Sequence, residues 1–248
     1  MRSKITTLFF DLGYTLINFE GNVPRILRKS YLSLADSLMH SGININRKEF
    51  TRQYEQIINR YYAARETDNV EQPASLFVNR ALACFNLPPA SPEVLKAAIA
   101  AMYKVTEAHW HLEKDTHHTL AELKQSGCRM CIISNASNTE DLNNLVDNAN
   151  LRQYFDAIVI SAEEGIRKPD RRIYNKALSL MKSTPEESLM VGDTLGADIL
   201  GAQEVGIYAV WISRRARRPE NMRVKKKIKP DKEISRLSQL PKLVDTIR

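Results

Sequence analysis

Residues 5–15 read ITTLFFDLGYT, a short apolar run rich in β-forming residues that ends at Asp11. This pattern is typical of a buried parallel strand that delivers a polar side chain at its C-terminal edge. The residues that follow carry no further strand-like run until after Lys114. The first strand must therefore pair with strands that come much later in the chain.

Beyond Lys114 the pattern alternates between helix-like and strand-like segments. In chain order these segments are THHTLAELKQSG, CRMCIIS, EDLNNLVDN, AIVIS, DRRIYNKALSLM, SLMVGD, ADILGAQEVG and YAVWIS. Such alternation predicts βαβ units and a parallel sheet with helices on both faces.

The region from Ile17 to about Glu113 has helical spacing throughout, with Pro24, Pro73 and Pro92 near expected helix starts. We therefore expect an α/β fold with two domains. Residues 1–16 and 114–248 would form a doubly wound, Rossmann-like core, and residues 17–113 would form an inserted, all-helical cap.

Composition is that of an ordinary globular protein, with 43% hydrophobic and 26% charged residues in a chain of 248. The N-terminal apolar stretch is broken by Asp11 too early for a signal peptide or a membrane span. Three cysteines cannot form a disulfide framework, and Cys128 and Cys131 lie within a strand-like run, where buried, inert thiols are expected. These features predict a cytoplasmic protein without membrane insertion, and they carry no indication of its oligomeric state.

The net charge of +7 comes from one segment, residues 214–229. This segment holds nine basic residues and only Glu220 as an acid, so the rest of the chain is nearly neutral. It has no interleaved aromatic residues and no nucleic-acid motif. We interpret it as a solvated surface loop, with contact to nucleic acid or another polyanion as the alternative.

Polar residues follow the predicted strands at four places. They read DLGYT at 11–15, SN at 134–135, RKP at 167–169 and GDTLGAD at 192–198. Ligands in open parallel sheets bind beyond the carboxyl ends of the strands, so these residues should converge. A carboxylate can attack a phosphoryl group, a hydroxyl can bind a phosphate oxygen, and a lysine can neutralise it. The carboxylates of Asp193 and Asp198 are hard oxygen ligands of the kind that suit magnesium.

Each of these residues alone also has a purely structural explanation. Asp11 could be a turn residue and Lys168 a solvated loop cation, while Ser134, Asn135, Asp193 and Thr194 could cap the helices that follow. The helices after Ser134 and Asp193 would also turn free backbone N–H groups toward one place, which suits a phosphate.

The four motifs, in this order and at strand ends, resemble those of the haloacid dehalogenase superfamily, and the resemblance covers the whole chain, cap included. It implies a magnesium-dependent phosphatase of small phosphorylated metabolites. The implied roles are Asp11 as the nucleophile that forms an aspartyl-phosphate, Ser134 and Asn135 in phosphate binding, Lys168 in charge neutralisation, Asp11, the Gly13 carbonyl and Asp193 as Mg²⁺ ligands, and Thr15 and Asp198 in support.

Gly13 is the point at which the sequence departs from that pattern. Most phosphatases of the superfamily carry a second Asp there, which protonates the leaving alkoxide and later activates water. Loss of a general acid–base costs ~10²–10⁴-fold in rate. Substrates with good leaving groups, such as acyl or anomeric phosphates, or an acid supplied by the cap or the substrate would compensate.

Two further classes of function remain open. Phosphonate hydrolases of the superfamily also lack the second Asp and use a cap lysine as a Schiff base, for which Lys29 or Lys48 would be candidates. The dehalogenase branch needs no magnesium, so the pair of Asp193 and Asp198 argues against it. A binding or regulatory module with little turnover, meeting a polyanion through residues 214–229, is the other alternative.

Overall fold

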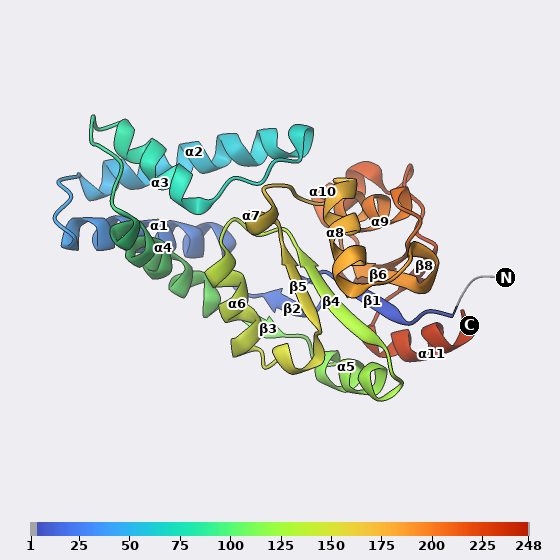
Figure 1. The fold of residues 1–248 in the computed structure, drawn as a ribbon. Coiled ribbons are helices and arrows are strands. Elements are labelled where there is room, and N and C mark those ends of the chain that lie inside the picture. The colour runs from blue at the N-terminus through green and yellow to red at the C-terminus, as the bar shows by residue number, and fades with distance from the viewer. Residues whose placement is uncertain (1–3, 248) are drawn as a thin grey trace.

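The computed structural model describes residues 4–247 and contains a six-stranded parallel sheet (Figure 1). The strand order is β5-β4-β1-β6-β7-β8, with β1 in the interior. The strands are β1 (Thr7–Phe10), β4 (Arg129–Ser134), β5 (Ala157–Ile160), β6 (Ser188–Gly192), β7 (Tyr208–Ile212) and β8 (Lys232–Ile234). Strand β1 pairs with β4 and β6, both far along the chain, as its sequence predicted. The first three residues and Arg248, which the predicted core includes, lie outside the described residues.

Helices cover both faces of the sheet because successive strand residues point in opposite directions. Leu8 and Phe10 pack with α5 (Thr116–Gln125), α6 (Thr139–Asn148) and α11 (Leu240–Thr246). Phe9 packs on the other face with α8 (Arg171–Met181), a π-helix at Leu195–Leu200 and α9 (Gly201–Glu204). Two short helices, α7 (Ser161–Glu164) and α10 (Pro219–Val224), complete the core. The fold is the doubly wound α/β architecture that the alternating pattern predicted.

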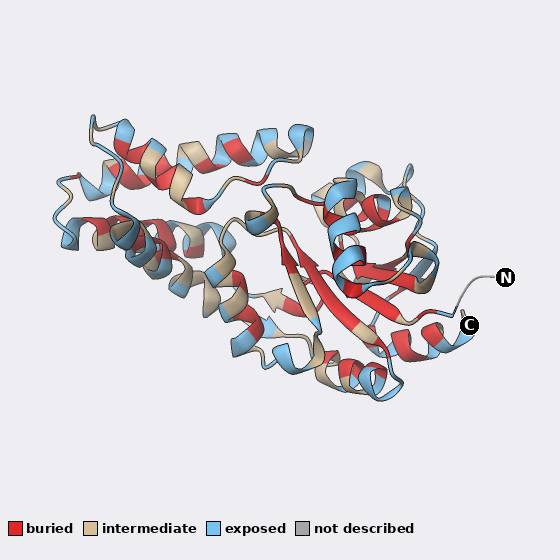
Figure 2. Ribbon diagram, viewed as in Figure 1, coloured by how far each residue is buried: buried red, intermediate tan, exposed pale blue. Residues whose placement is uncertain are grey.

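The first four helices of the chain form a separate unit with its own apolar interior, seen as the red faces of these helices in Figure 2. They are α1 (Val23–His40), α2 (Arg47–Asp68), α3 (Ala74–Ala83) and α4 (Pro92–Glu107). Leu34, Phe50 and Phe77 are among its fully buried residues. Asparagine and serine side chains cap α1, α2 and α4 at their N-termini, where such residues bind the free backbone N–H groups.

The expectation that residues 17–113 are all helical is wrong at both ends of that range. Strand β2 (Ile17–Phe19) pairs antiparallel with β3 (Trp110–Leu112), and this ribbon joins the helical unit to the core. Three-residue strands are too short to show a period-two pattern in the sequence. The ribbon matters for function because it brings Trp110 next to Gly13.

Two expectations concern the cysteines and the membrane. Cys128 and Cys131 are buried, and burial raises the pKa of the Cys131 thiol to about 12, so its reactive thiolate form is suppressed. Within residues 4–247, none of the helices combines the length and the apolar character that a membrane span requires.

Candidate active site

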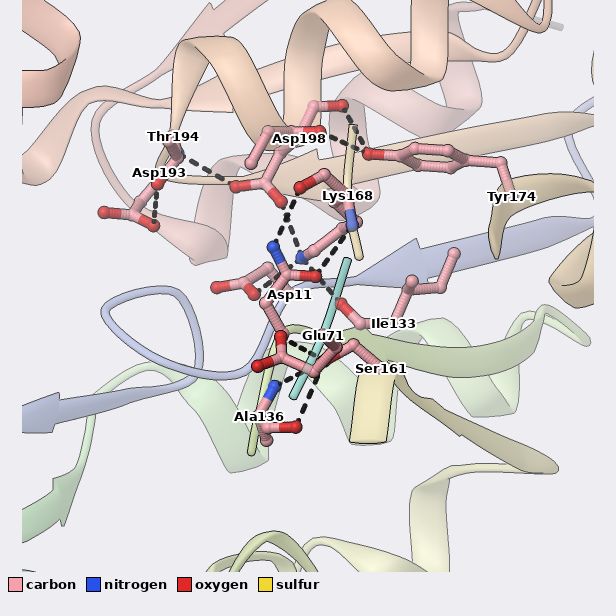
Figure 3. Close-up of polar contacts among 12 residues, drawn as sticks. Asp11, Glu71, Ile133, Ala136, Ser161, Lys168, Tyr174, Asp193, Thr194 and Asp198 are labelled. Carbon is pink, nitrogen blue, oxygen red and sulfur yellow. Dashed lines mark hydrogen bonds and ion pairs between the residues drawn. The ribbon is translucent and has the colours of Figure 1, made fainter. Parts of the chain in front are cut away.

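Lys168 lies at the centre of a cluster of acceptors at the carboxyl ends of the strands (Figure 3). Its Nζ donates to Asp11 Oδ1 at 2.8 Å, to Asp198 Oδ1 at 2.7 Å and to the carbonyl of Ile133 at 2.7 Å. Lys168 is only 2% exposed. Three acceptors satisfy all three ammonium protons, which fixes the lysine in one position against Asp11.

The charge state of Lys168 follows from two opposing effects. Burial by itself favours the neutral amine, but the negative charges of Asp11 and Asp198 outweigh it and hold the pKa of Lys168 above its ordinary value. The lysine is therefore a permanent cation beside the Asp11 carboxylate. Lys168 is therefore not a solvated loop cation, which was the purely structural explanation for this residue.

Asp11, Asp193 and Asp198 form a carboxylate cluster in which one oxygen of each lies within 4.8 Å of the others. Burial, together with the charges of its neighbours, raises the pKa of Asp193 to about 7, and burial raises that of Asp198 to about 6 in spite of Lys168. Crowded, desolvated carboxylates of this kind attract a cation. Their hard oxygen atoms fit a divalent ion such as Mg²⁺, so the donor set agrees with the ion that the sequence implies.

Close packing at Gly192 brings Asp198 into this cluster. A Cβ atom at position 192 would lie 2.3 Å from Asp198 Cγ, so only glycine leaves room for the carboxylate. Asp198 Oδ2 accepts from the backbone N–H of Thr194 at 2.9 Å, and Tyr174 donates its hydroxyl to the carbonyl of Ala197 at 2.5 Å. Thr194 thus binds the carboxylate of Asp198, while Tyr174 holds the backbone that carries it.

The expectation of free N–H groups at the helix after Asp193 is wrong for Thr194 and Leu195. The N–H of Thr194 is bound by Asp198, and the N–H of Leu195 donates to Asn221 Oδ1 at 2.8 Å. These side chains satisfy the donors that a helix start leaves open. This helix end therefore has fewer donors available for a phosphate than the sequence suggested.

Ser134 and Asn135 do not cap the helix that follows them, because the N-cap of α6 is Asn138. Ser134 ends β4, and its hydroxyl makes no hydrogen bond with the residues that the structure describes. The amide of Asn135 binds both backbone groups of Lys168, donating to the carbonyl at 3.0 Å and accepting from the N–H at 2.8 Å. The Asn135 side chain thereby positions the lysine.

Thr15 and Gly13 lie in the turn that follows β1. The Thr15 hydroxyl oxygen is buried and, among residues 4–247, has no hydrogen-bond partner. Gly13 forms an isolated bridge with Ile17, and the Cβ of any other residue at position 13 would lie 3.2 Å from Trp110 Cη2. The indole therefore faces the position from which a second carboxylate would extend.

The interpretation of residues 214–229 as a solvated loop is wrong for Arg214, Arg215 and Arg218. Arg214 and Arg215 form ion pairs with Glu113, and Arg214 also binds Asp115 at 2.8 Å. Arg218 binds Asp193 Oδ2 at 2.7 Å. Three of the nine basic side chains are thus engaged with carboxylates, and one of them reaches the carboxylate cluster.

Glu71 is a second polar residue whose position the sequence did not indicate. It is buried where the loop before α3 meets the core, and it accepts from Tyr61 at 2.6 Å, from Ser137 at 3.0 Å and from Ser161 at 2.8 Å. The Ser161 hydroxyl in turn accepts from the N–H of Ala136 at 2.8 Å. Figure 3 shows Glu71, Ser161 and Ala136 beside the Lys168 cluster. The bond from Ser137 to Glu71 connects the helical unit to the loop that follows Ser134.

A small cavity of about 60 Å³ lies inside the helical unit and reaches the same loop. Its lining carries no formally charged side chain and includes four tyrosines, Tyr31, Tyr54, Tyr62 and Tyr103, together with Ser137 of the core. Residue Ser137 is shared with the Glu71 network.

Comparison with known proteins gives a family match over most of the chain. The model of the haloacid dehalogenase-like hydrolases matches residues 5–206. A glyceraldehyde 3-phosphate phosphatase of Methanothermobacter thermautotrophicus is 25% identical over 97% of this chain and 100% of its own length. A phosphoserine phosphatase of Thermus thermophilus is 33% identical over 53% of this chain and 51% of its own.

Solved structures show the same fold. A HAD phosphatase from Thermococcus onnurineus aligns with a TM-score of 0.66 and 24% identity over 97% of this chain and 98% of its own. A 2-haloacid dehalogenase from Pseudomonas syringae aligns with a TM-score of 0.67 and 22% identity over 98% of this chain and 100% of its own. Enzymes of two different activities thus share this architecture, so the fold alone does not select between them.

Proposed function

The chain belongs to the haloacid dehalogenase-like hydrolases, and from this premise we propose that it is a magnesium-dependent phosphatase of small phosphorylated metabolites with Asp11 as its nucleophile. The observation that carries the proposal is the contact of Lys168 with both Asp11 and Asp198. Relatives named as phosphatases align along nearly the whole chain or half of it, which supports a phosphoric monoester hydrolase.

In the proposed reaction a carboxylate oxygen of Asp11 attacks phosphorus, and the bond between phosphorus and the leaving oxygen breaks. The product is an aspartyl-phosphate and the free alkoxide or carboxylate of the substrate. Water then attacks the same phosphorus, which releases inorganic phosphate and restores Asp11. Lys168 and the Ser134 hydroxyl support both steps by holding charge and a hydrogen bond next to the phosphoryl oxygens.

Asp11, Asp193 and Asp198 are the side chains that would hold or surround Mg²⁺, with the Gly13 carbonyl as a further proposed ligand. When bound, the ion supplies positive charge that offsets the negative charge of the phosphoryl group. Their mutual distance of at most 4.8 Å and their oxygen donors support this assignment.

The turn after Asp11 supplies no carboxylic acid for the leaving group, because position 13 is a glycine that faces Trp110. Departure of a basic alkoxide without a proton donor is slow. We infer that the preferred substrates release an oxygen of low basicity, or that they bring their own proton donor.

Residues 17–113 are proposed to act as a cap domain over this site, with the remaining residues as the core. The Glu71 network ties the cap to the loop after Ser134. The glyceraldehyde 3-phosphate and phosphoserine phosphatases among the relatives suggest a substrate of comparable size. The tyrosine-lined cavity beside Ser137 is the cap feature available to its organic part.

The alternative activities receive less support from the positions of their residues. Lys29 and Lys48 are exposed, and Lys48 lines a surface hollow formed by cap residues alone, so neither is placed as a buried Schiff-base lysine would be. A polyanion-binding module is disfavoured because Arg214, Arg215 and Arg218 are paired within the chain.

A panel of phosphorylated metabolites, assayed with Mg²⁺ and with EDTA, tests the function. We expect phosphate release from at least one sugar phosphate, amino-acid phosphate or acyl phosphate that EDTA abolishes. Asp11→Asn should lower turnover at least about a hundredfold, since the amide keeps the shape but lacks the nucleophilic charge. Mass spectrometry should find a phosphoryl adduct on Asp11 in the quenched wild type. Activity of Asp11→Asn above a few per cent would remove Asp11 from this role.

A further inference from the structure

Arg218 occupies a defined position against the carboxylate cluster. Its guanidinium donates to Asp193 Oδ2 at 2.7 Å, forms a second ion pair with Glu220, and lies 4.1 Å from the centre of the Tyr14 ring. Asp193 itself is only 3% exposed. An arginine held by two carboxylates and an aromatic face is not a freely moving surface side chain.

Asn221 fixes the segment that carries Arg218. This residue is fully buried; its amide donates to the carbonyl of Asp193 at 2.8 Å and accepts from the N–H of Leu195 at 2.8 Å. The indole N–H of Trp211 donates to the same carbonyl at 2.9 Å. Helix α10 is therefore clamped to the residues that deliver Asp193, and Arg218 at its N-terminus is brought to this carboxylate by the fold.

We propose that Arg218 is a built-in competitor of Mg²⁺ for Asp193 and thereby sets a weak magnesium affinity in the protein without substrate. The inference rests on the magnesium site of the proposed function. It adds that one of the nine basic residues of segment 214–229 belongs to that site.

The balance of charge argues for competition. When they are ionised, Asp11, Asp193 and Asp198 bring three negative charges together, and Lys168 offsets one of them through Asp11 and Asp198. Arg218 offsets a second at Asp193. A divalent ion that binds the cluster must share Asp193 with the guanidinium or displace it. Removing the guanidinium leaves a more negative cluster and a free carboxylate oxygen, and both changes favour the ion.

The chain offers a matched control next to this residue. Arg217 carries the same charge on the same segment but is exposed, and it forms no ion pair or hydrogen bond with the residues that the structure describes. Arg218→Gln and Arg217→Gln therefore change the net charge equally. Only the first removes the contact with Asp193.

Isothermal calorimetry of Mg²⁺ binding to the phosphate-free protein tests the proposal. We expect Arg218→Gln to bind Mg²⁺ about tenfold more tightly than the wild type, and Arg217→Gln to bind with wild-type affinity. Equal tightening in both variants would assign the effect to long-range charge and overturn the proposal. Unchanged or weaker binding in Arg218→Gln would overturn it as well, since the arginine would then orient Asp193 for the ion.

A second measurement uses the wild type and does not depend on the stability of a variant that lacks the charge. The side-chain Nε–Hε NMR signal of Arg218 can be identified as the signal that is lost in Arg218→Lys. We expect this signal to shift during the Mg²⁺ titration, with a midpoint at the same Mg²⁺ concentration as in calorimetry. A signal that stays fixed while the ion binds contradicts competition.

The failure of this inference can be told apart from the failure of the magnesium site. If the wild type binds Mg²⁺ and Asp193→Asn weakens binding, the site stands, and only the behaviour of Arg218→Gln decides the inference. If neither the wild type nor Arg218→Gln binds the ion at millimolar concentrations, the magnesium site and the inference both fall.

Discussion

The indole of Trp110 packs against the position where a side chain at residue 13 would begin, with Cη2 3.2 Å from the Cβ position of Gly13. Trp110 belongs to β3, at the far end of the inserted helices, and is also packed edge-on against Tyr14 at a ring distance of 5.4 Å. An aromatic ring from another part of the chain therefore lies next to position 13, where the phosphatase pattern has a carboxylate. Gly13 is not kept for its backbone angle, since its φ does not lie in the positive region.

This contact sharpens the prediction for position 13. The rate of the wild type should fall steeply as the pKa of the leaving alcohol rises, because no carboxylic acid donates a proton from this position. Gly13→Asp combined with Trp110→Ala should flatten that dependence and raise the turnover of alkyl phosphates by about tenfold or more. Gly13→Asp alone should do less, because the indole crowds the new carboxylate.

A leaving-group series of aryl and alkyl phosphates, measured on the wild type, both single variants and the double variant, checks this. Trp110→Ala alone is the control for the opened space. A shallow slope already present in the wild type would show that another acid serves the leaving group, and the role given to Gly13 would then be wrong.

The effect of Lys168→Met on the free energy of unfolding tests the ion pairs of Lys168 with Asp11 and Asp198. The substitution keeps much of the side-chain volume but leaves Asp11 and Asp198 without their shared cation. Breaking a buried ion pair from one side costs roughly 3–5 kcal/mol. We therefore expect a loss of unfolding free energy of about this size in urea titrations at neutral pH.

Lys176→Met is the control for that loss. Lys176 is a largely exposed lysine of α8 whose ammonium lies 3.4 Å from Glu164, and exposed pairs contribute only about 0–1 kcal/mol. Equal losses for the two variants would show that the contacts of Lys168 are no stronger than those of a surface pair.

Some site residues are positioned by the strands that they end, and others by contacts with residues far away in the chain. Only the first kind could be predicted from the sequence. Asp11, Ser134 and Asp193 stand at the ends of strands with clear apolar patterns, and the topology of a parallel sheet brings such strand ends together. Lys168 was expected at a strand end as well, but helix α7 separates it from β5. The capping explanation for Ser134 failed only on a local detail, the position of the true N-cap at Asn138.

Contacts of the remaining site residues are set by tertiary packing and leave no periodic signal. Arg218 binds a carboxylate 25 residues earlier in the chain, and it stood in a basic run that reads as solvated surface. Glu71 belongs to a loop between helices, and its partners Ser137 and Ser161 lie in the core. The edge strand β8 has only three residues, two of them exposed, so it lacks the apolar run that marks the inner strands.

The outer half of the basic segment should behave differently from Arg218. Arg223, Lys226, Lys227 and Lys229 have no ion pair among the described residues, and only Lys225 lies over an aromatic ring, that of Trp211 at 5.3 Å. Replacing Arg223, Lys226, Lys227 and Lys229 by Gln should change the rate of hydrolysis of small substrates less than about twofold. Exposed charges act at a distance and are screened by salt. Steady-state kinetics at two ionic strengths measures this.

Binding of the wild type to DNA, RNA or anionic vesicles tests the polyanion alternative with the same four-residue variant. We expect that the wild type shows no binding to these polyanions that weakens steeply as the salt concentration rises. Such binding in the wild type, lost in the variant, would restore the polyanion-binding alternative.

The last prediction concerns Asp141 at the N-terminus of α6, where the core packs against α4. Burial, and secondly the negative charge of Glu107, raise the pKa of Asp141 from its ordinary value of 3.8 to about 8. Between these two values the folded protein holds a proton that the unfolded chain has released. The contribution of Asp141 to the free energy of unfolding therefore falls as the pH rises from about 4 to 8, and it levels off above that.

Asp141→Asn should remove the part of this pH dependence that Asp141 contributes, because the amide carries no charge to bury, and should leave the part that Asp193 and Asp198 contribute. We expect the variant to match the wild type near pH 4 and to be more stable at pH 8 by about 1–3 kcal/mol. Urea unfolding at several pH values measures the difference. Glu140→Gln, a change at the exposed neighbouring residue of the same helix, should leave the slope as it is. If Asp141→Asn is less stable than the wild type at pH 8, the carboxylate is charged and stabilised there, and the raised pKa given to Asp141 is wrong.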